Sequence, residues 1–336
     1  MGQGQDPSDK NKKLKLEEPL KELGSLFILK HKVVVISSIK ECEKLWREFS
    51  PNSTLFDTWE FRLAFYEAYK YKPYFLVLKR NGENLALLPL WYEDNNFYDK
   101  NLKRYTWFGS DWQEENKFFA KNIDYVPILL SLAPTPLYLN AISQEVAERL
   151  REKVDFKEDE PKYVLNLKGF KNHEDYLMTL KKNTRRNLRK DRNRILRQNP
   201  EVILDNFSDL EVLINLAKKR FKERGESVDW DDPRRVETFK NVIKFSGKSY
   251  KVRMIKVKIN GKDAGVDLVC VFNKTYYAAK CGYNISEFSG IGNFINLYEI
   301  DDAIKLGMEK IDFLQNNYQW KNKYFPPVSL YKFEKK

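Results

Sequence analysis

The stretch Glu287-Phe-Ser-Gly-Ile-Gly-Asn-Phe294 decides the expected fold, because its two glycines stand directly before a helix-like repeat. Asn293 is the expected N-cap of this helix, and Gly307 ends it as a C′ glycine does. The short run 310–314 then predicts a buried strand. The helix face is defined by apolar residues at spacings of three and four: Phe294, Leu297, Ile300 and Ile304.

A glycine loop that opens a helix can bind an anion, most often a phosphate, because its backbone N–H groups lie at the positive end of the helix dipole. Gly290 and Gly292 do not form a Walker A loop, since no Gly-Lys-Ser/Thr follows. They do not form a Rossmann fingerprint either, since the third glycine is missing. Two glycines before a helix are also typical of a tight turn, so the loop alone does not decide the function.

Composition restricts the class of protein. The chain has 336 residues, 42% hydrophobic and 14% aromatic, which is enough for two ordinary domains. Its formal net charge of +12 favours anionic partners, although many basic proteins have none. Three cysteines and two histidines fit neither a disulfide framework nor a metal site. No signal peptide or transmembrane segment is visible, so we expect a cytoplasmic protein.

Two hairpins are expected, one in each half of the chain. Apolar runs flank Asn81-Gly82 in the first and Asn260-Gly261 in the second, and Asn-Gly between such runs is a strong hairpin signal. A helical pattern precedes the first hairpin at 58–70. Two more, at 209–224 and 233–245, precede the second.

This repeated order predicts two copies of one module. We expect an α+β protein of two tandem modules, with mixed, mostly antiparallel sheets flanked by helices. The expected boundaries are a disordered tail at 1–22, an N-terminal module at 23–165 and a C-terminal module at 166–336. The glycine loop, at 287–293, belongs to the second module.

Six short stretches, taken in order, carry a family resemblance: Phe56-Asp-Thr-Trp59, Ala86–Leu90, Phe108-Gly-Ser-Asp111, Arg185–Arg189, Val257–Gly261 and Gly290-Ile-Gly292. They resemble the GNAT-related acyltransferase domain of CelD-like proteins, a group similar to the FemAB peptidoglycan aminoacyltransferases. The resemblance covers about 54–325 and implies two tandem GNAT-like modules. It also implies transfer of an acyl or aminoacyl group to an amine or hydroxyl of a glycan, peptide or cell-envelope precursor.

The same resemblance implies a cofactor, acyl-CoA, and the cysteine and histidine counts predict no metal. The family holds the pyrophosphate of acyl-CoA on a loop that corresponds here to Gly290, Ile291, Gly292 and Asn293. Glu287 departs from the family pattern, which has Gln or Arg at that position, and a carboxylate there would repel a pyrophosphate.

A basic segment at 176–198, expected as one helix, carries nine Lys and Arg residues. One interpretation is a solvated helix face. The other is an anion platform, because neighbouring cations add their fields and arginine binds phosphate through two N–H groups. Arg185 and Arg189 are four residues apart and therefore share a face, so they are the first candidates for the donor phosphate or for RNA.

Four residues are candidates for the chemistry. Lys321 matches the lysine of a Tyr-Lys pair in the family, and the resemblance implies that it offsets negative charge on the donor or the oxyanion. Trp320 replaces the tyrosine of that pair, which makes Tyr283 a candidate proton donor, with Tyr318 and Tyr324 as alternatives. Asp267, in an otherwise apolar strand, and Asp111 are candidates to accept the proton of the acceptor or to hold it, with Asp312 as the alternative.

Three functions stay open on the sequence alone. The leading hypothesis is an acyltransferase that uses acyl-CoA or another activated carrier and acts on an anionic small molecule or a glycan or peptide precursor. The second is a tRNA-dependent, FemAB-like aminoacyltransferase, for which binding should depend strongly on salt. The third is a GNAT-like scaffold without catalysis that binds nucleic acid or a protein partner.

Overall fold

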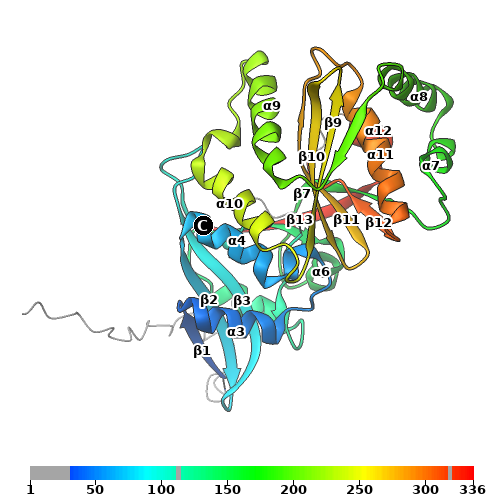
Figure 1. Cartoon of the computed structure of the whole chain (residues 1–336). Helices are drawn as coiled ribbons and strands as arrows, with labels where there is room; N and C mark the ends of the chain where they lie inside the picture. The colour runs from blue at the N-terminus through cyan, green and yellow to red at the C-terminus, as the bar shows by residue number, and fades with distance from the viewer. Residues whose placement is uncertain (1–30, 111–114, 317–319) are drawn as a thin grey trace, which may run out of the picture.

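A computed structural model describes residues 31–110, 115–316 and 320–336, and their strands form one long sheet (Figure 1). In this part of the chain the sheet has 13 strands, in the order β1-β2-β3-β4-β6-β13-β7-β12-β11-β10-β9-β8, with β5 paired to β3. The described strand pairs β4–β6 and β11–β12 are parallel and the others are antiparallel. The expected α+β fold with mostly antiparallel pairing is confirmed, and the tail at 1–22 lies outside the described residues.

The N-terminal half contributes the β1 edge of the sheet. Its elements, in chain order, are β1 (His31–Ile36), α3 (Ile39–Phe49), η1 (Leu55–Asp57), α4 (Trp59–Tyr69), β2 (Lys72–Arg80), β3 (Glu83–Asp94), β4 (Lys103–Trp107), β5 (Phe119–Ala120), α5 (Tyr125–Leu132), β6 (Leu137–Ser143), α6 (Gln144–Leu150) and β7 (Lys157–Asn166).

The C-terminal half contributes the β8 edge. Its elements are α7 (His173–Thr179), α8 (Lys182–Leu196), β8 (Glu201–Leu204), η2 (Phe207–Asp209), α9 (Leu210–Glu223), η3 (Asp229–Asp231), α10 (Pro233–Lys244), β9 (Lys251–Ile259), β10 (Lys262–Phe272), β11 (Thr275–Tyr283), α11 (Ile291–Lys305), β12 (Lys310–Asp312), α12 (Lys321–Tyr324) and β13 (Pro327–Lys335). With the two-residue β5 and the short helices η1, η2 and η3 left aside, the segments β1–β6 and β8–β12 both run strand, two helices, three strands, helix, strand, as expected for a repeated module.

Both expected hairpins form, β2–β3 and β9–β10. Their turns have positive φ at both central residues, 50° and 85° at Asn81 and Gly82, and 49° and 75° at Asn260 and Gly261. Two successive positive φ angles define the type I′ turn, whose twist matches that of the flanking strands. Asn and Gly tolerate this conformation best, which is why the pair predicted the turn correctly.

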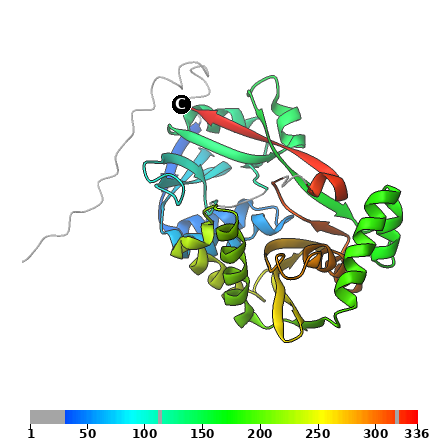
Figure 2. The same ribbon diagram turned by 90° about the horizontal axis from the view of Figure 1, so that it is seen from above.

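The last strand of the chain lies in the middle of the sheet. β13 pairs antiparallel with β6 along one edge and with β7 along the other, so it sits among strands of the N-terminal half. Figure 2 shows β13, in red, between the green strands β6 and β7. The two modules therefore share strands, an arrangement that the sequence pattern did not predict.

The two halves also share a hydrophobic core. Helices α4 and α10 pack against each other (Figure 1). Phe61 of α4 meets Tyr250 edge to face at 5.6 Å between ring centroids, and Phe65 meets Phe239 of α10 at 6.4 Å. All four rings are buried. Burial of large aromatic rings stabilises a contact strongly, so the halves form one packed body.

Two local expectations were wrong. The segment 176–198 is not one helix, because the backbone is extended at Leu180 and Lys181 and separates α7 from α8. Asn293 is not the N-cap of α11, because Gly290, at φ 93°, occupies that position and the helix begins at Ile291. Gly307, at φ 72°, does follow the last helical turn as a C′ glycine.

Candidate functional site

The parallel pair β11–β12 leaves most of one edge of β11 without a neighbouring strand. β12 pairs only with the first three residues of β11, which continues to Tyr283. Asn284 donates its backbone N–H to Ala264 beside β10, so by the alternation of an antiparallel ladder the N–H groups of Cys281 and Tyr283 point to the other edge. No described strand pairs with that edge beyond the first three residues. An extended ligand can accept these hydrogen bonds.

The corresponding pair in the N-terminal half, β4–β6, is filled by the chain itself. Asn116 forms a parallel bridge with Ile142, and its backbone N–H donates to Ala141 at 2.9 Å. Arg62 of α4 fixes Asn116 by donating to its Oδ1 at 2.7 Å. Of the two parallel strand pairs described, β11–β12 alone keeps an open edge.

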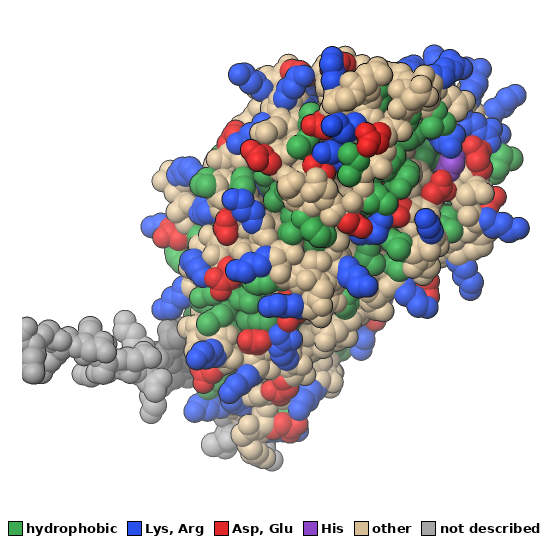
Figure 3. Space-filling view, viewed as in Figure 1, with side chains coloured by type: hydrophobic (Ala, Val, Ile, Leu, Met, Phe, Trp, Pro, Cys, Tyr) green, Lys and Arg blue, Asp and Glu red, His purple; other side chains and the backbone are tan. Residues whose placement is uncertain are grey.

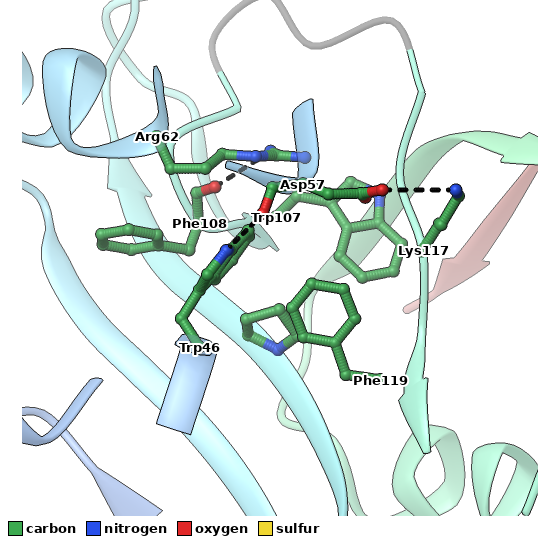
Figure 4. Close-up of a pocket in the computed structure, with 8 residues that line it drawn as sticks. Trp46, Asp57, Arg62, Trp107, Phe108, Lys117 and Phe119 are labelled. Atoms are coloured by element: carbon green, nitrogen blue, oxygen red, sulfur yellow. Dashed lines mark hydrogen bonds and ion pairs between the residues drawn. The ribbon is translucent and has the colours of Figure 1, made fainter. Parts of the chain in front are cut away.

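Arg62 lines a small pocket with Trp46, Asp57 and Lys117 (Figure 4). The guanidinium also donates to the carbonyl of Phe108 at 3.1 Å, and it lies over the Trp46 ring at 5.4 Å. Burial lowers the pKa of Arg62 to about 9. Its Nε, Nη1 and Nη2 each donate to an acceptor of the N-terminal half, so Arg62 acts here as part of the packing.

The side chains of Asp267, on β10, and Tyr283, on β11, meet beside the open edge of β11. The Tyr283 hydroxyl donates to Asp267 Oδ2 at 2.7 Å, and both side chains are buried. Glu299 of α11 adds its carboxyl group to the same cluster. Burial raises the pKa of Asp267 to about 7, although hydrogen bonds from Tyr283 and Glu299 lower it in part. Burial and the Asp267 charge raise the pKa of Tyr283 well above its usual value. A carboxyl group that titrates near pH 7 suits general base chemistry.

Cys281 lies directly opposite Asp267 in the β10–β11 ladder, and its side chain is exposed. Protein atoms nevertheless surround its sulfur closely enough that desolvation, helped by the Asp267 charge, raises its pKa to about 12. The thiolate is the nucleophilic form of cysteine. A thiol held protonated at neutral pH argues for direct transfer at this site rather than a covalent acyl-cysteine.

Lys321 is buried at the start of α12. Backbone carbonyls bind its ammonium group, so its charge is not available at the open edge of β11. Its Nζ donates to the backbone carbonyls of Phe313 and Gln315, each at 2.5 Å, and to that of Leu314 at 3.3 Å. The ammonium therefore fixes the chain that leaves β12. This contact set is structural, whereas the sequence suggested a catalytic role.

Replacing Lys321 by methionine should lower the free energy of unfolding by about 1–3 kcal/mol, because buried carbonyls would lose a charged donor. Urea unfolding followed by tryptophan fluorescence measures this loss. Lys323→Met is the control, because Lys323 is exposed on the same short helix. If the two variants unfold at the same urea concentration, Lys321 does not hold the loop.

The glycine loop is covered by α8. Asn293 donates to Asp191 Oδ2 at 2.8 Å, and a Cβ added to Gly290 would stand 2.8 Å from the Asp191 Cβ. Arg194 donates to Ser289 Oγ at 2.9 Å and thereby ties α8 to the loop. A carboxylate of the chain itself thus lies at the positive end of α11, where the sequence suggested a pyrophosphate.

Glu287 of the loop and the candidate arginines Arg185 and Arg189 of the basic segment also have local partners. Glu287 binds Lys262 at 2.5 Å, which lowers its pKa and offsets the negative charge. Arg189 binds Glu174 through two N–H groups, at 2.6 and 3.0 Å, and Arg185 donates weakly to the Met178 carbonyl at 3.4 Å. Neither arginine contacts the glycine loop.

The outer face of α8 keeps uncompensated charge. Within the described chain, no ion pair forms with Lys182, Arg186 or Lys190, and all three are exposed. Figure 3 shows Lys and Arg side chains gathered at the upper right of the molecule, where Figure 1 places α8. Uncompensated cations on one helix attract polyanions.

A buried ion cluster lies where β7 crosses between the halves. Lys162 Nζ binds Glu115 Oε2 at 2.5 Å and Asp312 Oδ2 at 2.9 Å, and Lys162 and Asp312 are buried. Despite burial, the two carboxylates raise the pKa of Lys162, and the lysine lowers the pKa of Glu115. Asp312, the alternative sequence candidate for the proton of the acceptor, is thus held in an ion pair with Lys162.

The structure brings together Asp267 and Tyr283 among the predicted catalytic residues, and it separates Lys321 from them by its contacts. Asp111 and Tyr318 lie outside the described residues. Sequence reasoning missed Glu299 and Asp191. Each had a local signal. Glu299 follows Ile291 and Ile295 at spacings of four on a buried helix face. Asp191 is the only acidic residue in the segment 176–198, which carries nine basic residues.

Residues 182–322 match the family model of the acetyltransferase (GNAT) domain. This stretch is a GNAT domain. It contains the open edge of β11, the glycine loop and the Asp267 cluster. The resemblance to the GNAT group, which was expected from the sequence, is confirmed. No curated protein sequence matches the chain.

Solved structures of similar fold cover nearly the whole chain. FemX is 10% identical, with a TM-score of 0.59, over 90% of this chain and 97% of FemX. The C-terminal domain of a putative lysylphosphatidylglycerol synthetase from Agrobacterium fabrum is 9% identical, with a TM-score of 0.53, over 88% and 91%. A tandem GNAT protein from the clavulanic acid biosynthesis pathway is 8% identical, with a TM-score of 0.50, over 91% and 98%. At these identities the similarity is one of fold.

Two absences within the described residues bear on the site. Three or more His, Cys, Asp or Glu side chains do not gather anywhere in a way that could hold a metal ion. None of the helices in 31–110, 115–316 and 320–336 has the length and apolar character that crossing a membrane requires.

Proposed function

We propose that the protein is an acyltransferase whose GNAT domain moves an acyl or aminoacyl group from an activated carrier to an amine or hydroxyl group. The observation that carries the proposal is the open edge of β11, the strand whose Tyr283 donates a hydrogen bond to Asp267. The acceptor would be an anionic glycan, a peptide or another cell-envelope precursor. The name of one protein of similar fold, lysylphosphatidylglycerol synthetase, describes an aminoacylated lipid and fits this class.

In this proposal each group of the site has one task. The N–H groups of Cys281 and Tyr283 hold the carbonyl of the donor and the oxyanion that forms on attack. The acceptor amine or hydroxyl attacks the carbonyl carbon, and its proton passes through Tyr283 to Asp267. The bond between the carbonyl carbon and the carrier then breaks, and the carrier leaves with a proton.

Acyl-CoA is the first donor to test, since GNAT folds generally bind it. Its pyrophosphate would compete with the Asp191 carboxylate for the N-terminus of α11. The uncompensated charges on α8 support a second candidate, a tRNA-linked aminoacyl group, because a polyanion gains from each phosphate contact.

Reversing two charges on α8 separates these donors. In Arg186→Glu/Lys190→Glu the affinity for total tRNA should fall at least tenfold, and the salt dependence should flatten by about two phosphate contacts. The matched control is Lys40→Glu/Lys44→Glu, because these lysines are also exposed and four residues apart on a helix, α3. Equal loss in both variants would mean that net charge alone attracts tRNA.

Thermal stability with CoA, acetyl-CoA, UDP-sugars and total tRNA identifies the donor class, because a ligand of the native state raises the Tm by mass action. The donor that binds is then incubated with a mixture of UDP-linked precursors, and mass spectrometry follows an acceptor that gains the acyl mass. Asp267→Asn is the negative control for transfer. Without a Tm shift or a product for any of the four, the proposal fails.

A further inference from the structure

Glu299 is the most deeply buried acid beside the site, and the transfer scheme above does not use it. It lies on α11 with no solvent exposure, and its carboxyl group shares a hydrogen bond with that of Asp267. Neither Glu299 oxygen accepts a hydrogen bond from a donor group in the described chain. Asp267 Oδ1 likewise has no conventional donor, while Oδ2 accepts from Tyr283.

Within the described residues, no cation acts on either carboxyl group of this pair; the charge of Arg220, on α9, acts on Cys281 and offsets part of its raised pKa. Tyr283 and Cys281 of β11 face the pair and are neutral at pH 7. Asp302, one turn further along α11, is negative and already bound to Arg253, whose Nε lies 3.0 Å from Asp302 Oδ2, and to the Tyr276 hydroxyl at 3.1 Å. Arg253 is thus engaged by Asp302 rather than by Glu299.

Two carboxyl groups in contact, buried and without a cation, cannot both be ionised, because each charge would be desolvated and would repel the other. One proton shared between them removes the repulsion. Asp267 is the better anion because the Tyr283 hydroxyl stabilises its charge by donating to it. Glu299 has no such donor, so it retains the proton and donates it to Asp267.

We propose that Glu299 is a positioning residue, held as the neutral acid, which donates to Asp267 and so makes Asp267 the single base of the site. This inference rests on the proposed acyl transfer for its role, but not for its protonation. One oxygen of Asp267 is then bonded to Glu299 and the other to Tyr283. Of these three residues, only Tyr283 belongs to β11 and lies at its open edge. The arrangement orients the carboxylate toward the incoming proton.

The proton balance of the transfer follows from this arrangement. As the acceptor amine forms its bond to the acyl carbon, its proton moves to the Tyr283 oxygen while the Tyr283 proton moves to Asp267 Oδ2. The pair is then neutral, with one proton on each carboxyl group. When the bond to the carrier breaks, the same proton returns through Tyr283 to the leaving sulfur or oxygen. Glu299 keeps its own proton throughout.

Infrared spectroscopy tests the protonation without any transfer assay. At pH 8 the wild-type protein should show the C=O band of a protonated carboxylic acid, shifted in heavy water, and Glu299→Gln should lose it. Glu309→Gln is the control, because Glu309 is exposed and paired with Lys274, so the band should remain. A wild-type protein without this band, or a band that survives in Glu299→Gln, would overturn the proposal.

The pH profile of transfer tests the positioning role. Glu299→Gln keeps a donor to Asp267, so kcat/KM should stay within about threefold and its acidic limb should not move. Glu299→Leu removes the donor and raises the pKa of Asp267, so the limb should move to higher pH by at least one unit, with a loss of kcat at pH 7 of about fivefold or more and an unchanged KM.

The two measurements separate the two proposals. If the infrared band behaves as expected but the wild-type protein transfers no acyl group from any donor, the shared proton stands and the proposed function fails. If transfer occurs but Gln and Leu at position 299 give the same profile, the function stands and Glu299 is only part of the packing.

Discussion

Asp267→Asn should lower the rate of acyl transfer by about 10²–10⁴-fold, the usual contribution of a general base, and should at the same time make the protein more stable above pH 7. The loss of rate follows because an amide cannot take the acceptor proton. The gain in stability follows because burial in the folded protein disfavours the ionised form of Asp267 and raises its pKa to about 7.

The sign of the pH dependence can be worked out from that pKa. An unfolded aspartate titrates near pH 4, so between about pH 4 and pH 7 the folded protein binds more protons than the unfolded chain. Stability contributed by this group therefore falls as the pH rises through this interval and is constant above it. Asparagine has no such titration, so the advantage of Asp267→Asn should grow to at most about 4 kcal/mol.

Urea unfolding of both proteins from pH 4 to pH 9 measures this difference. Asp302→Asn is the matched control and should behave in the opposite way, since Asp302 is ion-paired with Arg253 and its loss should destabilise the protein. A stable, active Asp267→Asn protein would remove Asp267 from the chemistry. An inactive protein that is less stable at every pH would make it a packing residue.

Lys162→Met should have the largest effect on stability, a loss of about 3–5 kcal/mol. The substitution leaves the buried Asp312 carboxylate without an ion-pair partner in the described chain, and Glu115 keeps only Lys117, at 3.7 Å. An unpaired charge costs far more free energy when it is buried than when it is exposed. The unfolding free energy in urea at pH 7 measures the loss. Lys274→Met is the control, because the Lys274–Glu309 pair is 66% exposed at both side chains and should change stability by less than about 1 kcal/mol.

A second set of variants identifies the cause. Lys162→Met combined with Asp312→Asn should recover part of the lost stability, because fewer charges are left unpaired. The lysine lowers the pKa of Glu115, so in the wild-type protein this pair stabilises above the ordinary glutamate pKa, and the contribution disappears as the pH falls. Lys162→Met should weaken that acid sensitivity. A double variant as unstable as the single one would point to lost packing instead.

The sequence predicted the elements well where the signal is local. Asn-Gly requires a positive φ at two successive residues, and both hairpins form there. The apolar spacing after Gly292 correctly predicted a helix. Its start was predicted too late, because the N-cap is Gly290 and not Asn293. Turn chemistry and periodicity act within a few residues, which is why they can be read from one chain.

The contacts that define the site act across long separations, and no periodicity records them. Asp191 meets Asn293 across 102 residues, and Lys162 meets Asp312 across 150. The sequence therefore predicted an open anion site at the glycine loop, whereas in the structure α8 covers this loop. Lys321 likewise matched a family position, but its contacts depend on how the chain after β12 folds back.

The position of β13 has a consequence for how the chain is made. A ribosome makes residues 327–335 long after β6 and β7, yet this strand fills the space between those two strands of the N-terminal half. The N-terminal half thus cannot complete its sheet until β13 has been made, and its edges at β6 and β7 stay available for wrong pairing until then. We expect the nascent protein to depend on chaperones until residues 327–335 have left the ribosome, and the two halves to fold as a single unit only from that point.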